Sequence, residues 1–187
     1  GIETYLASRP TPTTADLTAA SQLYESMGDF PKANALREQM KTLDPAGSMV
    51  LKDRATAVRN EPNWERKKTA YLAYQKEFPN STYLPALTVM MTDGYFKNND
   101  IKGLVTFVEQ QPVSHTDVMM LNSMAFQLAD ERRSLPESEQ LITRALSILK
   151  TQAKPANVTG NWETEKQNRQ RQLMNTYARS LEQQGKY

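Results

Sequence analysis

The sequence contains no cysteine and a single histidine, His115, and these two absences remove several kinds of chemistry from consideration. Without cysteine, the chain cannot form internal disulfides, thiolate zinc sites, iron–sulfur clusters or a thiol nucleophile. One histidine leaves only carboxylates to hold a metal, and no loop has the Asp-rich spacing of a calcium site. We therefore expect neither a metal nor a cofactor.

Long apolar runs and an excess of one charge are also missing. The longest nearly apolar stretch, residues 83–91, is far shorter than the roughly 18 residues of a membrane-spanning helix, so we expect no membrane insertion. Lys and Arg number 23 and Asp and Glu number 21, and both signs are spread evenly along the chain. Without a basic face, electrostatics predict no nucleic-acid partner.

The lone histidine does not suggest an active site. It lies in Ser114-His115-Thr116-Asp117, which carries the residue types of a hydrolase, but neighbours at a helix entry cannot converge as a catalytic triad does. We interpret Ser114 as a helix cap with Asp117 in the first turn. No other set of acid, base and nucleophile stands out, and we expect the chain not to be an enzyme.

Glycine is scarce, at seven residues, and no alternating segment is flanked by a hairpin dipeptide, which argues against a β-sheet. Apolar residues instead recur at intervals of three and four. Thr13 with Asp16 forms a capping box, and Gly28-Asp29 can end one helix and cap the next. The pattern predicts an all-α chain with about nine helices, at 13–27, 30–43, 48–60, 63–78, 81–97, 100–111, 114–132, 135–153 and 162–184.

The expected helices repeat in pairs. The first members begin near residues 14, 48, 81, 114 and 161, so the successive steps are about 34, 33, 33 and 47 residues. Pro45, Pro79 and Pro112 close the first three pairs, where a helix–turn–helix unit needs a residue that cannot continue the helix. A fixed period of this length is typical of a helical repeat protein.

The best unit, residues 23–33 (LYESMGDFPKA) closed by Leu43-Asp44-Pro45, resembles the tetratricopeptide repeat, with its aromatic, Gly-Asp-aromatic, Ala and closing Pro pattern. The resemblance covers about residues 14–153 and implies a right-handed α-α superhelix of antiparallel helix pairs. Lys67 departs from the pattern at a small-residue position. Weaker matches come from Ala55, Pro79, Tyr95, Asn99-Asp100-Ile101, Ser138, Ala145, Ala178, Leu181, Gly185 and Tyr187.

These observations predict a division of the chain into four parts. Residues 1–12 form an N-terminal extension, residues 13–153 four helical hairpins, residues 154–161 a loop, and residues 162–187 the helix of a fifth unit. The fifth unit consists of a first helix and its turn without a second helix. We interpret it as a capping unit or as part of a longer protein.

A second resemblance supplies an alternative. Residues 121–129, Ala145-Leu146 and Tyr177-Ala178 resemble the helical regions joined to thioredoxin-like domains in bacterial envelope proteins. That resemblance implies an accessory region of a larger enzyme in the periplasm or cell envelope. Its active site would lie outside this chain.

The tetratricopeptide resemblance implies that the first helix of each pair lines a concave face that binds a protein or an extended peptide. Lys52 and Arg59 are the cations that we expect to bind an acidic side chain or a terminal carboxylate. The alternative is a solvated polar face without a ligand. In register, the face carries Gln22, Glu25, Lys52, Thr56, Arg59, Asp93, Phe96, Ser123, Gln127, Asn175 and Arg179.

Overall fold

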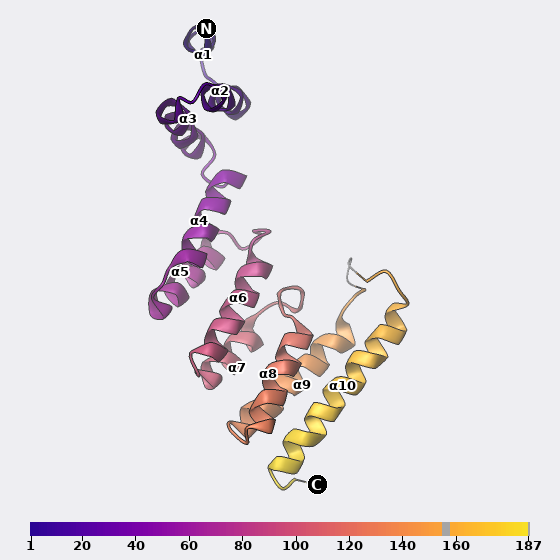
Figure 1. Ribbon diagram of the computed structural model, residues 1–187. Coiled ribbons are helices and arrows are strands. Elements are labelled where there is room, and N and C mark those ends of the chain that lie inside the picture. Colours follow the sequence, from indigo (N-terminus) through magenta and orange to yellow (C-terminus); the bar gives the residue numbers. More distant parts are fainter. Residues whose placement is uncertain (155–157, 187) are drawn as a thin grey trace. The chain divides into compact units, whose positions relative to one another are not determined.

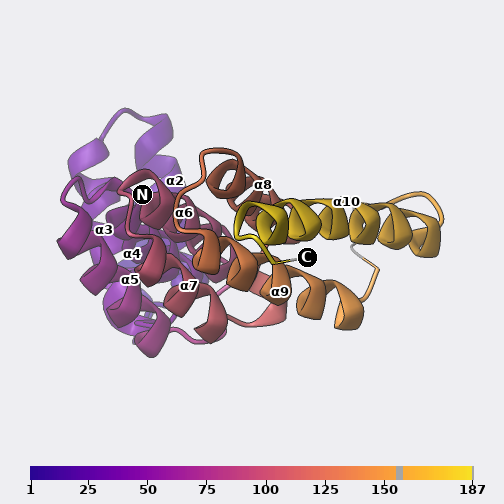
Figure 2. The ribbon, with the colours of Figure 1, turned by 90° about the horizontal axis from the view of Figure 1, so that it is seen from below.

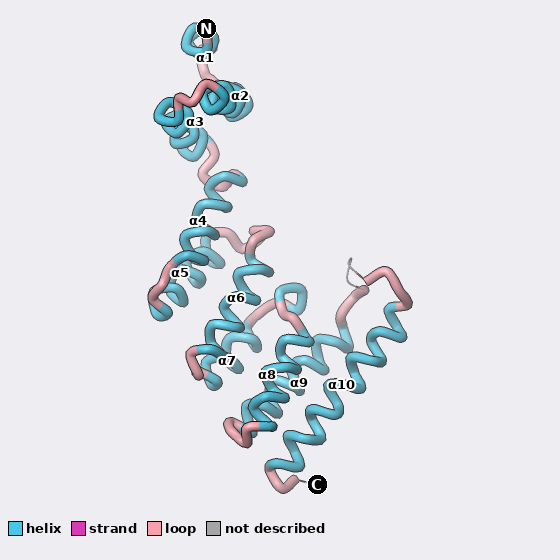
Figure 3. Tube along the Cα trace, viewed as in Figure 1, coloured by secondary structure: helices cyan, strands magenta, loops and turns pink. Residues whose placement is uncertain are grey.

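The computed structural model describes residues 1–154 and 158–186, which form ten α-helices, one short 3-10 helix and no β-strand (Figures 1 and 3). The predicted all-α fold class is therefore confirmed. The helices are α1 (Ile2–Ala7), α2 (Thr14–Ser26), α3 (Phe30–Leu43), α4 (Ser48–Asn60), α5 (Trp64–Glu77), α6 (Leu84–Lys97), α7 (Ile101–Gln110), the 3-10 helix η1 (Val113–His115), α8 (Val118–Asp130), α9 (Leu135–Thr151) and α10 (Trp162–Gln183).

The chain divides into two compact units, Gly1–Tyr83 and Leu84–Tyr187. The first unit holds α1 to α5, in which α2 packs on α3 and α4 on α5. In the second unit α6 packs on α7 and α8 on α9, and α10 lies against both α8 and α9 (Figure 2). Successive helices thus form hairpins in both units. The loop expected at residues 154–161 includes 155–157, which lie outside the described residues.

Four helices end in the same backbone turn, in which one residue adopts a left-handed conformation. That residue is Gly28 after α2, Asn99 after α6, Arg132 after α8 and Gly185 after α10, with φ values of 78°, 57°, 52° and 68°. These are Schellman motifs, which satisfy carbonyls at the helix end. In each motif the next amide donates to a carbonyl five positions earlier: Asp29 to Tyr24 (2.9 Å), Asp100 to Tyr95 (3.0 Å), Arg133 to Leu128 (3.0 Å) and Lys186 to Leu181 (2.9 Å).

The helix starts follow the expected capping chemistry at several places. Thr13 and Asp16 form the predicted reciprocal capping box at α2, and the Asp29 carboxylate accepts the amide of Lys32 at the start of α3. Asn63 and Asn161 cap α5 and α10 in the same way. Short polar side chains therefore satisfy amides that the first helical turn leaves free.

Two predicted helix starts were wrong. Helix α6 begins at Leu84 rather than near residue 81, because the buried Ser81 side chain bonds to the Tyr74 hydroxyl (2.6 Å) and accepts the amide of Tyr83 (3.2 Å) in a turn. Helix α8 begins after Asp117, whose carboxylate accepts the amides of residues 119 and 120, so Ser114 is not its cap. Ser81 therefore stabilises a turn ahead of its helix, and Ser114 lies in the short 3-10 helix η1 ahead of α8.

Each unit has its own apolar core. In the first unit Leu17, Tyr24, Ala33 and Leu36 are buried between α2 and α3, and α1, in the segment expected as an extension, packs against them. In the second unit the core is built mainly from leucine and isoleucine. Its fully buried members include Leu104, Leu121, Leu128, Leu141, Ile142 and Ile148.

Candidate functional site

The expected cation Lys52 lies in a groove between α3 and α4 of the first unit. The groove has a volume of about 630 Å³, and Arg37, Lys41, Asp53 and Tyr83 are among its lining residues. Such a volume lies within the usual range of small-ligand clefts, and a peptide side chain fits inside it. The first unit therefore provides a recess that contains charged side chains at one of the predicted positions.

The other cations of this groove already have partners. The Lys41 ammonium lies 2.6 Å from Asp53 and 2.8 Å from Glu38, and its hydrogen bond to Asp53, followed by that to Glu38, raises the pKa of Lys41. Arg37 pairs with Glu25. Among the described residues, no carboxylate lies within ion-pair distance of Lys52. An acidic ligand group entering the groove would therefore meet Lys52 without first displacing an internal carboxylate.

Thr56 and Arg59 lie on the same face of α4 as Lys52, since they follow it by four and seven residues. All three are exposed, whereas Ala55 and Val58 on the adjoining side of the helix are buried. The structure thus places the three expected residues of α4 on one accessible stripe. The stripe spaces its two cations by about two helical turns, close to 10 Å along the axis.

The expected residues of α2 differ from each other. Gln22 is exposed and has no hydrogen bond recorded for its side chain within the described part of the chain. Glu25 is half-buried and is occupied by its ion pair with Arg37. Gln22 is therefore available to a ligand, and Glu25 serves chiefly to neutralise a cation of α3.

In the second unit most of the expected residues have partners within the chain. Asp93 pairs with Lys97 at 2.6 Å, one turn later on α6. The Gln127 amide donates to Glu131 at 2.7 Å, and this hydrogen bond is the main cause of the lowered pKa of Glu131. These contacts are local consequences of the spacing of four residues on a helix.

Two further expected residues take part in contacts between elements of the second unit. The guanidinium of Arg133 lies over the ring of Phe96, 5.6 Å from its centroid. Arg179 of α10 pairs with Asp130 of α8 and lies 5.4 Å from the ring centroid of Phe126. Asn175 and Ser123 are exposed. The face formed by α8 and α10 therefore offers amides and hydroxyls, and the charge of Arg179 is balanced within the chain.

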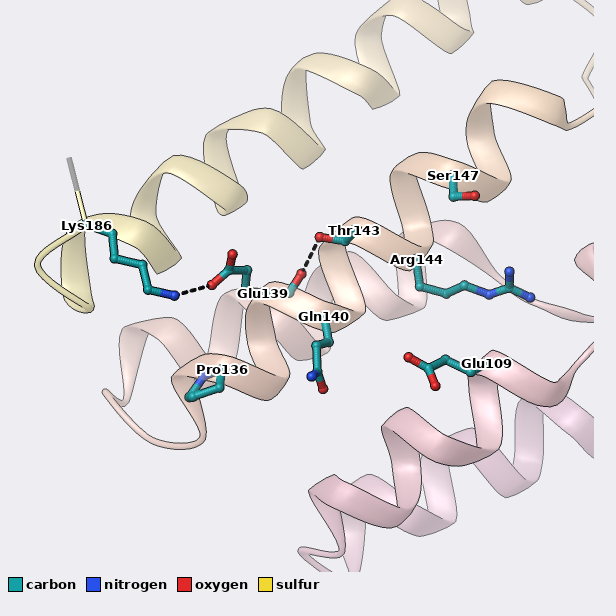
Figure 4. A pocket seen from close by; sticks show the side chains of 8 residues that line it. All are labelled: Glu109, Pro136, Glu139, Gln140, Thr143, Arg144, Ser147 and Lys186. Atoms are coloured by element: carbon teal, nitrogen blue, oxygen red, sulfur yellow. Dashed lines mark hydrogen bonds and ion pairs between the residues drawn. The ribbon is translucent and has the colours of Figure 1, made fainter.

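A second recess, between α7 and α9, contains charged residues that the sequence reasoning missed (Figure 4). Its volume is about 510 Å³, and Figure 4 shows Glu109 and Arg144 pointing into the gap from the two helices. The Arg144 guanidinium donates to the carbonyls of Val108 (3.3 Å) and Gln111 (2.9 Å), which caps the carboxyl end of α7. Arg144 therefore has a structural role that links two helices.

The opposite end of this recess carries an ion pair between α9 and the turn that follows α10. Lys186 donates to Glu139 at 2.9 Å, and this hydrogen bond, followed by one from Gln184, lowers the pKa of Glu139. The two partners lie 47 residues apart in sequence. The helical periodicity of the sequence does not predict that these two residues meet. They come together because α10 packs on α9.

No protein-family model, curated protein or solved structure matches this chain. Within residues 1–154 and 158–186, no three His, Asp or Glu side chains are gathered as a metal site. None of the described helices combines the length and the apolar character needed to cross a membrane.

Proposed function

We propose that this chain is a non-catalytic protein-binding module of the tetratricopeptide-like class. It takes an acidic protein or peptide segment on the exposed face of α4, where Lys52 and Arg59 bind carboxylate groups. The observation that carries the proposal is the position of Lys52 in a groove whose other cations are already paired. The hairpins of α2–α3, α6–α7 and α8–α9, which share one type of turn, support the assignment to a helical repeat.

The expected energetics are those of charge-assisted hydrogen bonds at a partly open surface. Each such bond contributes about 1.5–3 kcal/mol when well formed, which corresponds to roughly a tenfold to hundredfold change in the dissociation constant. Exposed ion pairs contribute less, about 0–1 kcal/mol. Because Lys52 lies in a groove and Arg59 on an open helix face, we expect Lys52 to contribute more.

The test is binding by the whole chain and by two double variants. Lys52→Ala/Arg59→Ala removes the proposed contacts, and Arg66→Ala/Lys76→Ala removes two exposed cations of α5 as the matched control. The proposal predicts that acidic peptides bind to the parent and the control and are lost from the first variant, with helical content unchanged. Equal binding by all three proteins would refute it.

An accessory role in a larger envelope enzyme is the second candidate, and it predicts a different outcome. In that case no acidic peptide binds any of the three proteins, and activity requires sequence beyond this chain. No contact in the structure favours this candidate over peptide binding. Binding measured with the isolated chain therefore separates the two.

A further inference from the structure

A third recess, the α9/α10 groove, lies in the second unit. Its volume is about 520 Å³, and its lining includes Leu146, Leu149, Lys150, Lys166 and Met174. Figures 1 and 2 both show α9 and α10 side by side. A recess between two helices with a mainly apolar lining suits the apolar face of another helix.

The floor of the groove is apolar. Leu149 is almost completely buried, Leu146 is half-buried, and Met174 exposes 47% of its surface. Leucine and methionine at this depth offer an adaptable apolar strip, which is typical of surfaces that receive the apolar face of an amphipathic helix. An exposed methionine of this size is also removed from water when such a helix binds.

The charges of the groove are concentrated at one end. Lys150 lies in the last turn of α9, and Lys166 lies near the start of α10, where its ammonium donates to the Lys150 carbonyl at 3.0 Å. Neither lysine pairs with a carboxylate among the described residues. A bound helix would be favoured with its carboxyl-terminal end, which is the negative end of its dipole, and its acidic side chains at these lysines. Such a helix would run antiparallel to α10.

The second unit already contains a helix held in an equivalent way. Helix α9 packs on α8, the helix before it, and also against α7, the second helix of the previous hairpin. The α9/α10 groove is the equivalent position for a helix that would pack on α10. It lies between α10 and α9, and α9 is the second helix of the preceding hairpin. The packing of α9 therefore shows that such a position in this fold accepts a helix.

We propose that the α9/α10 groove is a docking surface for an amphipathic helix of a partner protein. The helix lies antiparallel to α10, with its apolar stripe on Leu146, Leu149 and Met174. Its carboxyl-terminal turn is acidic and lies at Lys150 and Lys166. This surface is separate from the face of α4 and goes beyond the proposed function.

Helix α7 supplies a probe of this chemistry. A synthetic peptide with the sequence of residues 100–111 has an apolar stripe and a glutamate, Glu109, in its last turn. A hydrocarbon staple between the exposed positions of Lys102 and Thr106 holds it helical, because a free helix of this length is marginal in water. The matched probe carries Glu109→Lys.

The experiment titrates each peptide into the whole chain with methyl-labelled methionine and follows the methyl signals by NMR. We expect the Met174 signal to shift and that of Met27, which is 71% exposed in the first unit, to stay in place. The Glu109→Lys peptide should bind about two- to fivefold more weakly. Leu146→Glu in the protein should weaken binding by about tenfold or more, because it puts a charge against the apolar stripe.

A charge exchange fixes the direction of the helix. Lys166→Glu in the protein should weaken binding of the parent peptide and restore binding of the Glu109→Lys peptide. A Met174 signal that does not move, or a Lys166→Glu protein that binds both peptides equally, would overturn the proposal. The Lys52→Ala/Arg59→Ala variant should bind the α7 peptide as the parent does, so the result is independent of the function proposed for α4.

Discussion

The Schellman motif that ends four of the helices predicts stability changes of opposite sign for substitutions at two equivalent positions. Gly28 and Arg132 both have the left-handed backbone of a Schellman motif, with φ of 78° and 52°. A residue with a Cβ atom costs about 1–2 kcal/mol in this conformation. Glycine, however, loses more backbone entropy on folding than a residue with a Cβ atom does. This entropy loss costs roughly 0.5–1 kcal/mol of stability. Glycine is therefore favoured at this position by a net amount of about 0.5–1 kcal/mol.

The structure allows this net preference to be measured without a change in side-chain contacts. A Cβ atom added at Gly28 meets no other atom within 4 Å, so Gly28→Ala changes only the backbone preference and should destabilise the first unit by about 0.5–1 kcal/mol. The Arg132 side chain is exposed and makes no contact recorded within the described residues. Arg132→Gly should therefore stabilise the second unit by a similar amount.

The assay is chemical unfolding followed by residue-resolved NMR, so that each substitution is measured in its own unit. Met27→Gly is the matched control, because Met27 has an ordinary right-handed backbone with φ of −88°. Glycine at this position should therefore destabilise the first unit. The reasoning would be refuted if Arg132→Gly destabilises its unit as Met27→Gly does. It would equally be refuted if Gly28→Ala has no effect.

Two other predictions concern the first unit. The buried Tyr74 hydroxyl bonds to the Leu51 carbonyl (3.1 Å) and to Ser81 (2.6 Å), so Tyr74→Phe should lower the unfolding free energy by about 1–3 kcal/mol in a denaturant titration, and an unchanged midpoint would contradict this. The Tyr5 hydroxyl and the Thr13 backbone lower the pKa of Asp16 to about 2 from 3.8. Its contribution to stability should be complete above pH 3.8 and disappear as the pH falls through 2. In a carboxyl NMR titration Tyr5→Phe should raise this pKa, and a parent value near 3.8 would be evidence against the Tyr5 contact.

The elements that could be predicted from the sequence are those set by local chemistry. Thr13 with Asp16, and Gly28 with Asp29, act within one or two turns of the backbone, so their residue types specify a helix start and a helix end directly. Helical periodicity likewise gave the all-α class. The start near Ser81 was misplaced because serine satisfies a turn as readily as a helix end. The start near Ser114 was misplaced because Asp117, three residues later, caps the helix instead.

The site was less accessible to sequence reasoning, because it depends on pairs formed between distant residues. Arg179 is neutralised by Asp130, which lies 49 residues earlier. Lys41 reaches Asp53 on the next helix, which leaves Lys52 as the unpaired cation of their groove. A long charged side chain can reach several neighbouring groups. The helical period indicates only the face on which the residue lies and does not indicate its ion-pair partner.

The most direct test of the proposed function is affinity capture from a lysate of the source organism with mass spectrometry. The parent chain, Lys52→Ala/Arg59→Ala and Arg66→Ala/Lys76→Ala would be compared after circular dichroism has shown equal helical content. The account predicts a protein with an acidic segment that is retained by the parent and the control and lost from the Lys52→Ala/Arg59→Ala variant. Equal retention by all three proteins would contradict the assignment of the binding face to α4.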